Sequence, residues 1–179
     1  MEKLSLLIAD DDADVRRAAR LALAAYANVV ETASLDEMTA QLAACAFDVV
    51  LLDMNFALGE HSGRDGMDGL ARIKAADPTL SVILMTAFGA VSLAVEALKR
   101  GGADFILKPW RNDALVASVQ VAAAQTQQKR EGESLELDGI ERNTIEKALQ
   151  RHSGNIAQAA AALGLSRPAL YRRLSKYGL

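Results

Sequence analysis

The sequence is poor in several residue types, and each shortage excludes a class of protein. A single cysteine, Cys45, excludes an intramolecular disulfide framework and fits a reducing cytosol. Aromatic residues make up only 4% of the chain, so its core has to be built from Ala, Leu, Val and Ile. No apolar run reaches the ~18 residues of a membrane span, and no signal peptide precedes the first strand-like segment. We therefore expect a cytoplasmic protein without a membrane partner.

Apolar residues are nonetheless plentiful, at 51% of 179 residues, which is enough for one ordinary domain and a smaller one. Up to about residue 125, strand-like and helix-like segments alternate. Strands are expected over residues 4–9, 29–33, 47–54, 81–86 and 104–109, and helices over residues 13–27, 34–45, 67–76, 90–102 and 112–125. Five successive β–α units favour a doubly wound, five-stranded parallel sheet of the α/β class.

The rest of the chain has a different character. Residues 126–136 are polar and indicate either a linker or a frayed extension of the preceding helix. Residues 137–179 have helical patterns only, with a turn at 153–155 and a last helix capped by Ser166. Helix, short turn and helix in this order are typical of a helix-turn-helix module. We therefore expect one domain over residues 1–125, a linker over 126–136 and a small all-α domain over 137–179.

Charge is divided between the two parts. The formal net charge of the chain is −3. Residues 1–128 hold 11 Lys and Arg against 17 Asp and Glu, a net charge of −6, and residues 129–179 hold 9 against 6, a net charge of +3. Residues 151–179 contain five basic residues and no acidic one. This asymmetry is expected if only the C-terminal part meets nucleic acid.

Polar side chains follow four of the five expected strands. Aspartates 10–12 follow the first strand, and Asp53, Thr86 and Lys108 lie at the ends of the third, fourth and fifth. Ligands bind at the carboxyl ends of the strands in such sheets, so these groups would converge. Several carboxylates around one point need a cation, and an all-oxygen set with room for water favours Mg²⁺ over zinc. Lys108 and Thr86 would then contact a phosphoryl group that Asp53 attacks.

The motifs "DDD", "LLDMN", "MTAFG" and "ILKPW" resemble the receiver domain of two-component response regulators, over about residues 4–125. The resemblance implies a flavodoxin-like sheet, Mg²⁺ as cofactor and a sensor histidine kinase as partner. It makes Asp53 the phosphoacceptor, Asp10, Asp11, Asp53 and the main-chain carbonyl of Asn55 the metal ligands, and Thr86 and Lys108 the residues that hold the phosphoryl group. Phe105 would be the switch aromatic that responds to Thr86, and the Lys108–Pro109 peptide bond would be cis.

One stretch departs from the commonest receiver pattern. Residues 56–65, "FALGEHSGRD", are an insertion that resembles the longer loop of some NtrC-like regulators. The insertion follows the acceptor and could influence access to Asp53. It contains His61, which we interpret as a solvated loop residue rather than a ligand.

Residues 140–179 resemble the Fis-type helix-turn-helix that ends NtrC-family regulators, through GN at 154–155, LGLSR at 163–167 and LYRRL at 170–174. The resemblance implies double-stranded DNA as a partner, and a homodimer formed through the first helix of the module, about residues 138–151. The N-terminus of the last helix would enter the major groove, where Arg167 would read a guanine edge. The predicted DNA-binding residues are Asn155, Ser166, Arg167, Tyr171, Arg172, Arg173 and Lys176, the last four as phosphate contacts.

NtrC-like proteins carry an ATPase domain between these two parts, and this sequence has no GxxxxGK phosphate loop and no room for one. The chain is therefore either a regulator with two parts or one from which the middle domain has been removed. We expect a transcription regulator whose phosphorylation controls dimerisation and DNA binding. It would not be an enzyme, beyond catalysing its own phosphoryl transfer and dephosphorylation.

Two other interpretations remain. Asp10-x-Asp12 after an apolar strand, with Thr86 and Lys108, also resembles phosphatases of the haloacid dehalogenase type, in which Asp10 would be the nucleophile. That interpretation lacks an acidic pair after Lys108 and leaves Asp53 without a role. An architectural DNA-bending protein with a vestigial receiver is less favoured, because every receiver site residue is present.

Overall fold

The structure is a computed structural model of the chain, and it describes residues 3–56, 64–87 and 91–179. The chain divides into two compact units, residues 1–129 and residues 130–179. Most of the predicted insertion, residues 57–63 with His61, lies outside the described residues.

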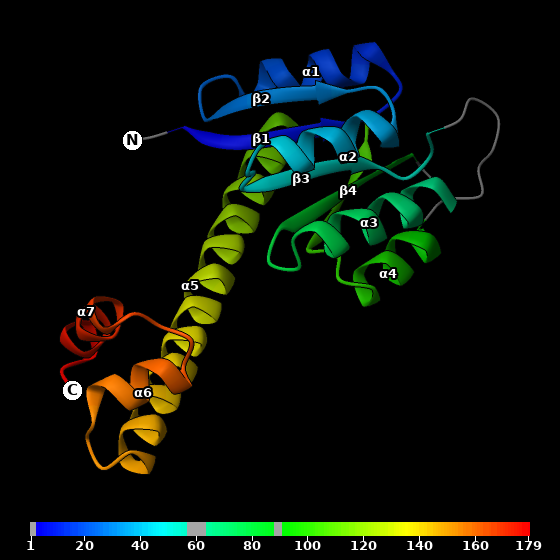
Figure 1. The fold of residues 1–179 in the computed structure, drawn as a ribbon. Helices are drawn as coiled ribbons and strands as arrows, with labels where there is room; N and C mark the ends of the chain where they lie inside the picture. Colours follow the sequence, from blue (N-terminus) through cyan, green and yellow to red (C-terminus); the bar gives the residue numbers. More distant parts are fainter. Residues whose placement is uncertain (1–2, 57–63, 88–90) are drawn as a thin grey trace. The chain divides into compact units, whose positions relative to one another are not determined.

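The first unit is built on a five-stranded parallel sheet, shown in Figure 1. The strands are β1 (Leu4–Ala9), β2 (Ala27–Thr32), β3 (Val49–Asp53), β4 (Ser81–Ala87) and β5 (Asp104–Lys108), in the order β2-β1-β3-β4-β5. This order confirms the predicted doubly wound α/β fold. The order reverses between β1 and β3, so the carboxyl ends of these two strands border the crevice in which such sheets bind ligands.

Helices cover both faces of the sheet. They are α1 (Ala13–Leu23), α2 (Leu35–Ala44), α3 (Arg64–Ala76), α4 (Val91–Lys99) and the first part of α5 (Asn112–Arg151). One buried cluster joins α1 and α5 to alternate residues of the strands, such as Ile8 and Leu51. The other joins α2, α3 and α4 to the intervening residues, such as Leu7 and Leu52, and these three helices lie together on one side of the sheet in Figure 1. Both clusters consist mainly of aliphatic side chains, as the scarcity of aromatic residues predicts.

Helix α5 is longer than the sequence predicts. Residues 126–136, for which a linker or a frayed helix extension was expected, are helical, and α5 also includes the helix expected over about residues 138–151. Thr126 is fully buried, and its Oγ1 accepts a hydrogen bond of 2.9 Å from the main-chain N–H of Ser81, the first residue of β4. The first unit therefore fixes α5 at a residue beyond the predicted domain end at 125.

The second unit is helical. The C-terminal part of α5, α6 (Ile156–Ala162) and α7 (Arg167–Tyr177) enclose a small core of Ile145, Ala159, Ala160, Leu170 and Leu174. The turns before α6 and α7 each contain a glycine with a positive φ, Gly154 at 78° and Gly164 at 66°. Because glycine adopts this conformation without steric cost, both turns can be short. The two short connections produce the predicted helix-turn-helix.

In the parts of the chain that the structure describes, no helix combines the length and apolar character needed to cross a bilayer.

Candidate functional site

An acidic pocket lies at the carboxyl ends of β1, β3 and β5, where Asp10, Asp53 and Lys108 meet. Lys108 Nζ lies 2.7 Å from Asp10 Oδ2 and 2.9 Å from Asp53 Oδ1. Asp10 is fully buried and Asp53 is 4% exposed. Two carboxylates so poorly hydrated need a nearby cation, and the Lys108 ammonium supplies it.

A third carboxylate completes the cluster. One carboxylate oxygen from each of Asp10, Asp11 and Asp53 lies within 4.8 Å of the other two. The amide oxygen of Asn55, two residues after Asp53, is buried and has no hydrogen-bond partner among the described residues. Three carboxylate oxygens grouped in this way fit a hard divalent cation that keeps part of its water shell. The donor set therefore suits Mg²⁺ by its chemistry.

Burial sets the protonation of the pocket. It raises the pKa of Asp53 from 3.8 to about 6, because desolvation outweighs the stabilising charge and hydrogen bond of Lys108, and Asp10 adds repulsion. Burial alone would lower the pKa of Lys108, but its hydrogen bonds and attraction to Asp10 and Asp53 raise it overall. Lys108 therefore stays charged, and Asp53 is the group whose ionisation is costly.

The triple aspartate divides into different roles. Asp10 and Asp11 contribute to the pocket, whereas Asp12 caps α1 by accepting hydrogen bonds from the main-chain N–H groups of Asp14 and Val15. The Asp12 N–H donates a bond of 2.9 Å to Asp10 Oδ1. A helix start that immediately follows β1 thus holds the first pocket carboxylate.

Arg16 contacts the main chain of the acidic pocket, which the sequence pattern did not predict. The helical pattern places it on the polar side of α1, but its side chain is only 16% exposed. Its Nη1 donates to the main-chain oxygens of Asp10 at 2.7 Å and Asp11 at 3.1 Å, and its Nε lies 3.6 Å from Glu31 Oε2. The spacing from Asp10, six residues and hence the first turns of the following helix, is the signal that would have indicated it.

The remaining predicted receiver residues lie on β4 and β5. Thr86 is fully buried, and its Cα pairs in register with that of Leu107. Phe105 is half-buried and packs with Leu84 and the other residues of the α2–α4 core. The Lys108–Pro109 peptide bond is cis.

The predicted DNA-binding residues fall into three groups. Asn155 and Ser166 cap α6 and α7 through their side-chain oxygens. Arg167, Tyr171 and Arg172 are exposed on α7. Arg173 and Lys176 are paired instead with carboxylates of α5, Arg173 with Glu141 and Lys176 with Asp138.

The sheet order and the acidic pocket at its switch point define an α/β domain of the receiver class. The family model of the response regulator receiver domain matches residues 6–120, and the chain belongs to this family. The model described as "Bacterial regulatory protein, Fis family" matches residues 136–177. Only residues 121–135 separate the two matched segments, which leaves no room for an ATPase domain between them.

Relatives and solved structures agree with this assignment. The chain is 35% identical over 127 residues to the transcriptional regulatory protein ZraR of Salmonella typhimurium, covering 70% of this chain and 28% of that protein. It is 32% identical over 149 residues to the DNA-binding transcriptional regulator NtrC of the same organism, covering 83% of this chain and 31% of NtrC. The N-terminal receiver domain of a Bacteroides fragilis response regulator superimposes with a TM-score of 0.62 at 33% identity, covering 68% of this chain and 98% of that one. The chain thus spans less than a third of the length of these two curated relatives.

Proposed function

We propose that the chain is a DNA-binding response regulator that a sensor histidine kinase phosphorylates on Asp53. Residues 1–125 would receive the phosphoryl group, residues 137–179 would bind DNA, and residues 126–136 would connect them. The observation that carries the proposal is the buried Asp53 carboxylate, held beside Lys108 and two further aspartates. A regulator that receives from a kinase and binds DNA would act in the cytoplasm, which the single cysteine fits.

The geometry supports transfer to Asp53. An Asp53 carboxylate oxygen would form a bond to phosphorus while the bond from phosphorus to the nitrogen of a phosphohistidine breaks. Lys108 now bonds both Asp10 and Asp53, and its ammonium can exchange the Asp53 oxygen for a phosphoryl oxygen without leaving Asp10. Later attack of water on phosphorus would release inorganic phosphate and restore the carboxylate.

Asp10, Asp11, Asp53 and the main-chain carbonyl of Asn55 would hold Mg²⁺. A bound Mg²⁺ supplies positive charge that neutralises the phosphoryl oxygens during transfer. The chain contributes the rest of the stabilisation through Lys108, which stays protonated, and through the Thr86 hydroxyl at the end of β4.

Phosphorylation would act on the rest of the molecule through β4 and β5. Movement of Thr86 toward the phosphoryl group would make space for the ring of Phe105, which now packs half-buried on the α2–α4 side of the sheet. Since Phe105 has no hydroxyl, its displacement would affect the neighbouring residues through packing alone. The surface formed by α4, β5 and α5 would change shape as a result.

The second unit would bind DNA as a homodimer. Arg167 at the start of α7 would reach base edges, Tyr171 and Arg172 would contact phosphates, and the capping residues Asn155 and Ser166 would stand near the DNA backbone. Leu135, Leu137 and Ile140 on α5 are each more than half exposed, which favours the pairing of this helix with a second copy. Two linked modules would then bind a two-fold site with raised effective concentration.

Phosphorylation is tested with acetyl phosphate and Mg²⁺ on the whole chain. We expect one hydroxylamine-labile acyl phosphate, lost in Asp53→Asn and retained in Asp14→Asn, which removes an exposed carboxylate from α1. Acyl phosphate that persists in Asp53→Asn would contradict the assignment. Steady release of phosphate from unrelated esters would support the phosphatase interpretation instead.

The coupling of the two units is tested with beryllofluoride and Mg²⁺ as a phosphoryl mimic. Sedimentation and DNA affinity are measured with and without the mimic. We expect the mimic to favour the dimer and to tighten DNA binding. A chain whose association state and DNA affinity both ignore the mimic would exclude control by phosphorylation.

A further inference from the structure

The cations of helix α7 differ in whether a carboxylate pairs with them. Arg167, Tyr171 and Arg172 are exposed, and no described carboxylate pairs with either arginine. Arg173 and Lys176 face α5, along with the buried Leu170 and Leu174 that attach α7 to the core. The ion pairs with α5, and not the helical period, separate the two groups, because Arg172 and Lys176 are also four residues apart.

The α5 side of this contact holds two carboxylates. Arg173 Nε lies 2.5 Å from Glu141 Oε1, and Lys176 Nζ lies 2.7 Å from Asp138 Oδ1. Residues 138 and 141 are three apart on α5, so both carboxylates project from one face toward α7. Each cation of this face therefore has its own acidic partner.

Tyr177 joins the two ion pairs into one network. Its hydroxyl lies 3.0 Å from Asp138 Oδ1 and 2.5 Å from Glu141 Oε2, and the Lys176 ammonium lies 4.8 Å from the centre of its ring. The bonds of Lys176 and Tyr177 lower the pKa of Asp138, and those of Tyr177 and Arg173 lower the pKa of Glu141. We call the five residues the α5–α7 network: Asp138, Glu141, Arg173, Lys176 and Tyr177. Such a linked set has more persistent geometry than an isolated surface pair.

We propose that Asp138 and Glu141 are positioning residues for DNA binding, which hold α7 against α5 and keep Arg173 and Lys176 off the DNA phosphates. The inference rests on the proposed DNA binding by the second unit. It assigns contact with DNA to the residues of α7 that have no such carboxylate partner among the described residues, Arg167, Tyr171 and Arg172. It also explains why a basic module keeps two acidic residues beside its last helix.

The salt dependence of binding distinguishes the two kinds of cation. Affinity for DNA falls as salt rises, and each phosphate neutralised by a cation makes the slope of log affinity against log salt more negative by about 0.9. A cation already paired with a carboxylate adds nothing, because its counter-charge comes from the protein. Fluorescence anisotropy with a short random-sequence duplex, between about 50 and 200 mM salt, measures this slope.

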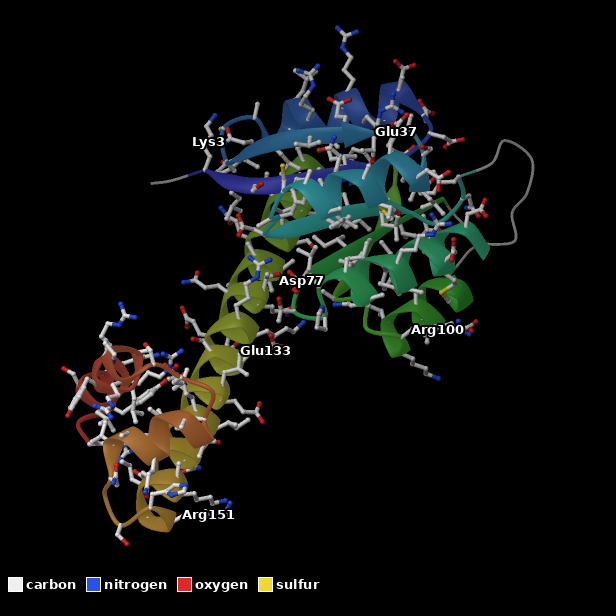
Figure 2. The ribbon with its side chains drawn as sticks, in the orientation of Figure 1. Lys3, Glu37, Asp77, Arg100, Glu133 and Arg151 are labelled. Carbon is white, nitrogen blue, oxygen red and sulfur yellow. The ribbon has the colours of Figure 1, made fainter. Side chains whose placement is uncertain are left out.

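The first pair of variants removes charge from α5. Asp138→Asn with Glu141→Gln frees both cations, so we expect tighter binding to the random duplex and a slope steeper by about one to two. The matched control, Glu133→Gln with Glu136→Gln, removes the same charge from exposed carboxylates of the same helix, and Glu133 is labelled in Figure 2. We expect the control to keep the wild-type slope. Equal slopes in the two double variants would overturn the proposal.

The second pair of variants removes single cations from α7, so the test does not depend on the first pair folding. Arg172→Gln should make the salt slope shallower by about one, so that raising the salt from about 50 to 200 mM reduces its affinity about threefold less than it reduces that of the wild type. Arg173→Gln should leave the slope unchanged. Melting followed by circular dichroism should show instead that Arg173→Gln destabilises the second unit more than Arg172→Gln does. A slope flattened equally by both changes would overturn the inference. Wild-type protein that binds no duplex would overturn the proposed function itself.

Discussion

Gly66, in the first turn of α3, approaches the main chain of Met54 so closely that no side chain fits between them. A Cβ at residue 66 would lie 2.6 Å from Met54 Cα and 2.9 Å from its carbonyl oxygen, and the Gly66 N–H donates to that oxygen at 3.3 Å. Met54 directly follows Asp53. The start of α3 is therefore fixed against the residue that follows Asp53, on the far side of residues 56–65.

Replacement of Gly66 by Ala should destabilise the first unit. The extra methyl group clashes with main-chain atoms rather than with a flexible side chain, so we expect a loss of about 1–3 kcal/mol in the free energy of unfolding, measured by chemical denaturation. Gly132→Ala is the control, because nothing lies within 4 Å of a Cβ at that helical position. The control should gain about 0.5–1 kcal/mol, and a gain in both variants would contradict the close approach.

Arg16→Gln should weaken Mg²⁺ binding by about 10- to 100-fold, because the side chain that orients the main chain of Asp10 and Asp11 is lost. Titration calorimetry measures the affinity without any phosphoryl donor. Arg17→Gln removes the same charge from an exposed position on the same helix and should leave the affinity close to that of the wild type. Equal losses in the two variants would point to net charge rather than to the hydrogen bonds of Arg16.

The stability of the first unit should depend on pH through Asp53 when no metal is bound. Its pKa is about 6 in the folded chain against an ordinary value of 3.8, so the folded state holds the proton more tightly. The resulting stabilisation is complete below about pH 4 and is lost as the pH rises through 6, a change of roughly 3 kcal/mol.

The variant Asp53→Asn should remove this pH step. In buffer with a chelator, the wild type should lose stability relative to Asp53→Asn between about pH 4 and 6, as measured by denaturation across the range. Asp14→Asn should follow the wild-type pH profile. An unchanged difference between the wild type and Asp53→Asn at all pH values would show that Asp53 is not desolvated.

Thr126→Val should destabilise the first unit by about 1–3 kcal/mol, because the Ser81 N–H would be left buried without its acceptor. Valine keeps the shape of the side chain, so the loss reports the hydrogen bond. Thr39→Val serves as the control, since the exposed Thr39 hydroxyl donates to the Leu35 carbonyl of its own helix. Equal effects of the two changes on thermal melting would contradict the role of Thr126 in fixing α5.

Local sequence patterns were sufficient to predict most of the fold. Buried strands such as β3 have nearly continuous apolar residues, and capping side chains such as Ser166 begin helices through contacts only a few residues away. The parallel order then follows from short right-handed connections, which bring Asp10, Asp53 and Lys108 to the same end of the sheet. The acidic pocket was predictable for this reason, although its individual roles remain predictions.

Tertiary contacts decided what these patterns left open. A polar run at residues 126–136 indicates a linker or a frayed helix extension; in the structure it is part of α5, whose Thr126 bonds to Ser81 of β4, 45 residues away in the sequence. Arg16 and Arg173 both lie in basic helical patterns typical of solvated faces, and each instead pairs with a carboxylate on another segment, Glu31 and Glu141 respectively. The sequence alone determined which residue types stand at each strand end and on each helix. Only the tertiary structure decided which of their charges are satisfied within the protein, because pairing depends on distances between segments that local periodicity does not encode.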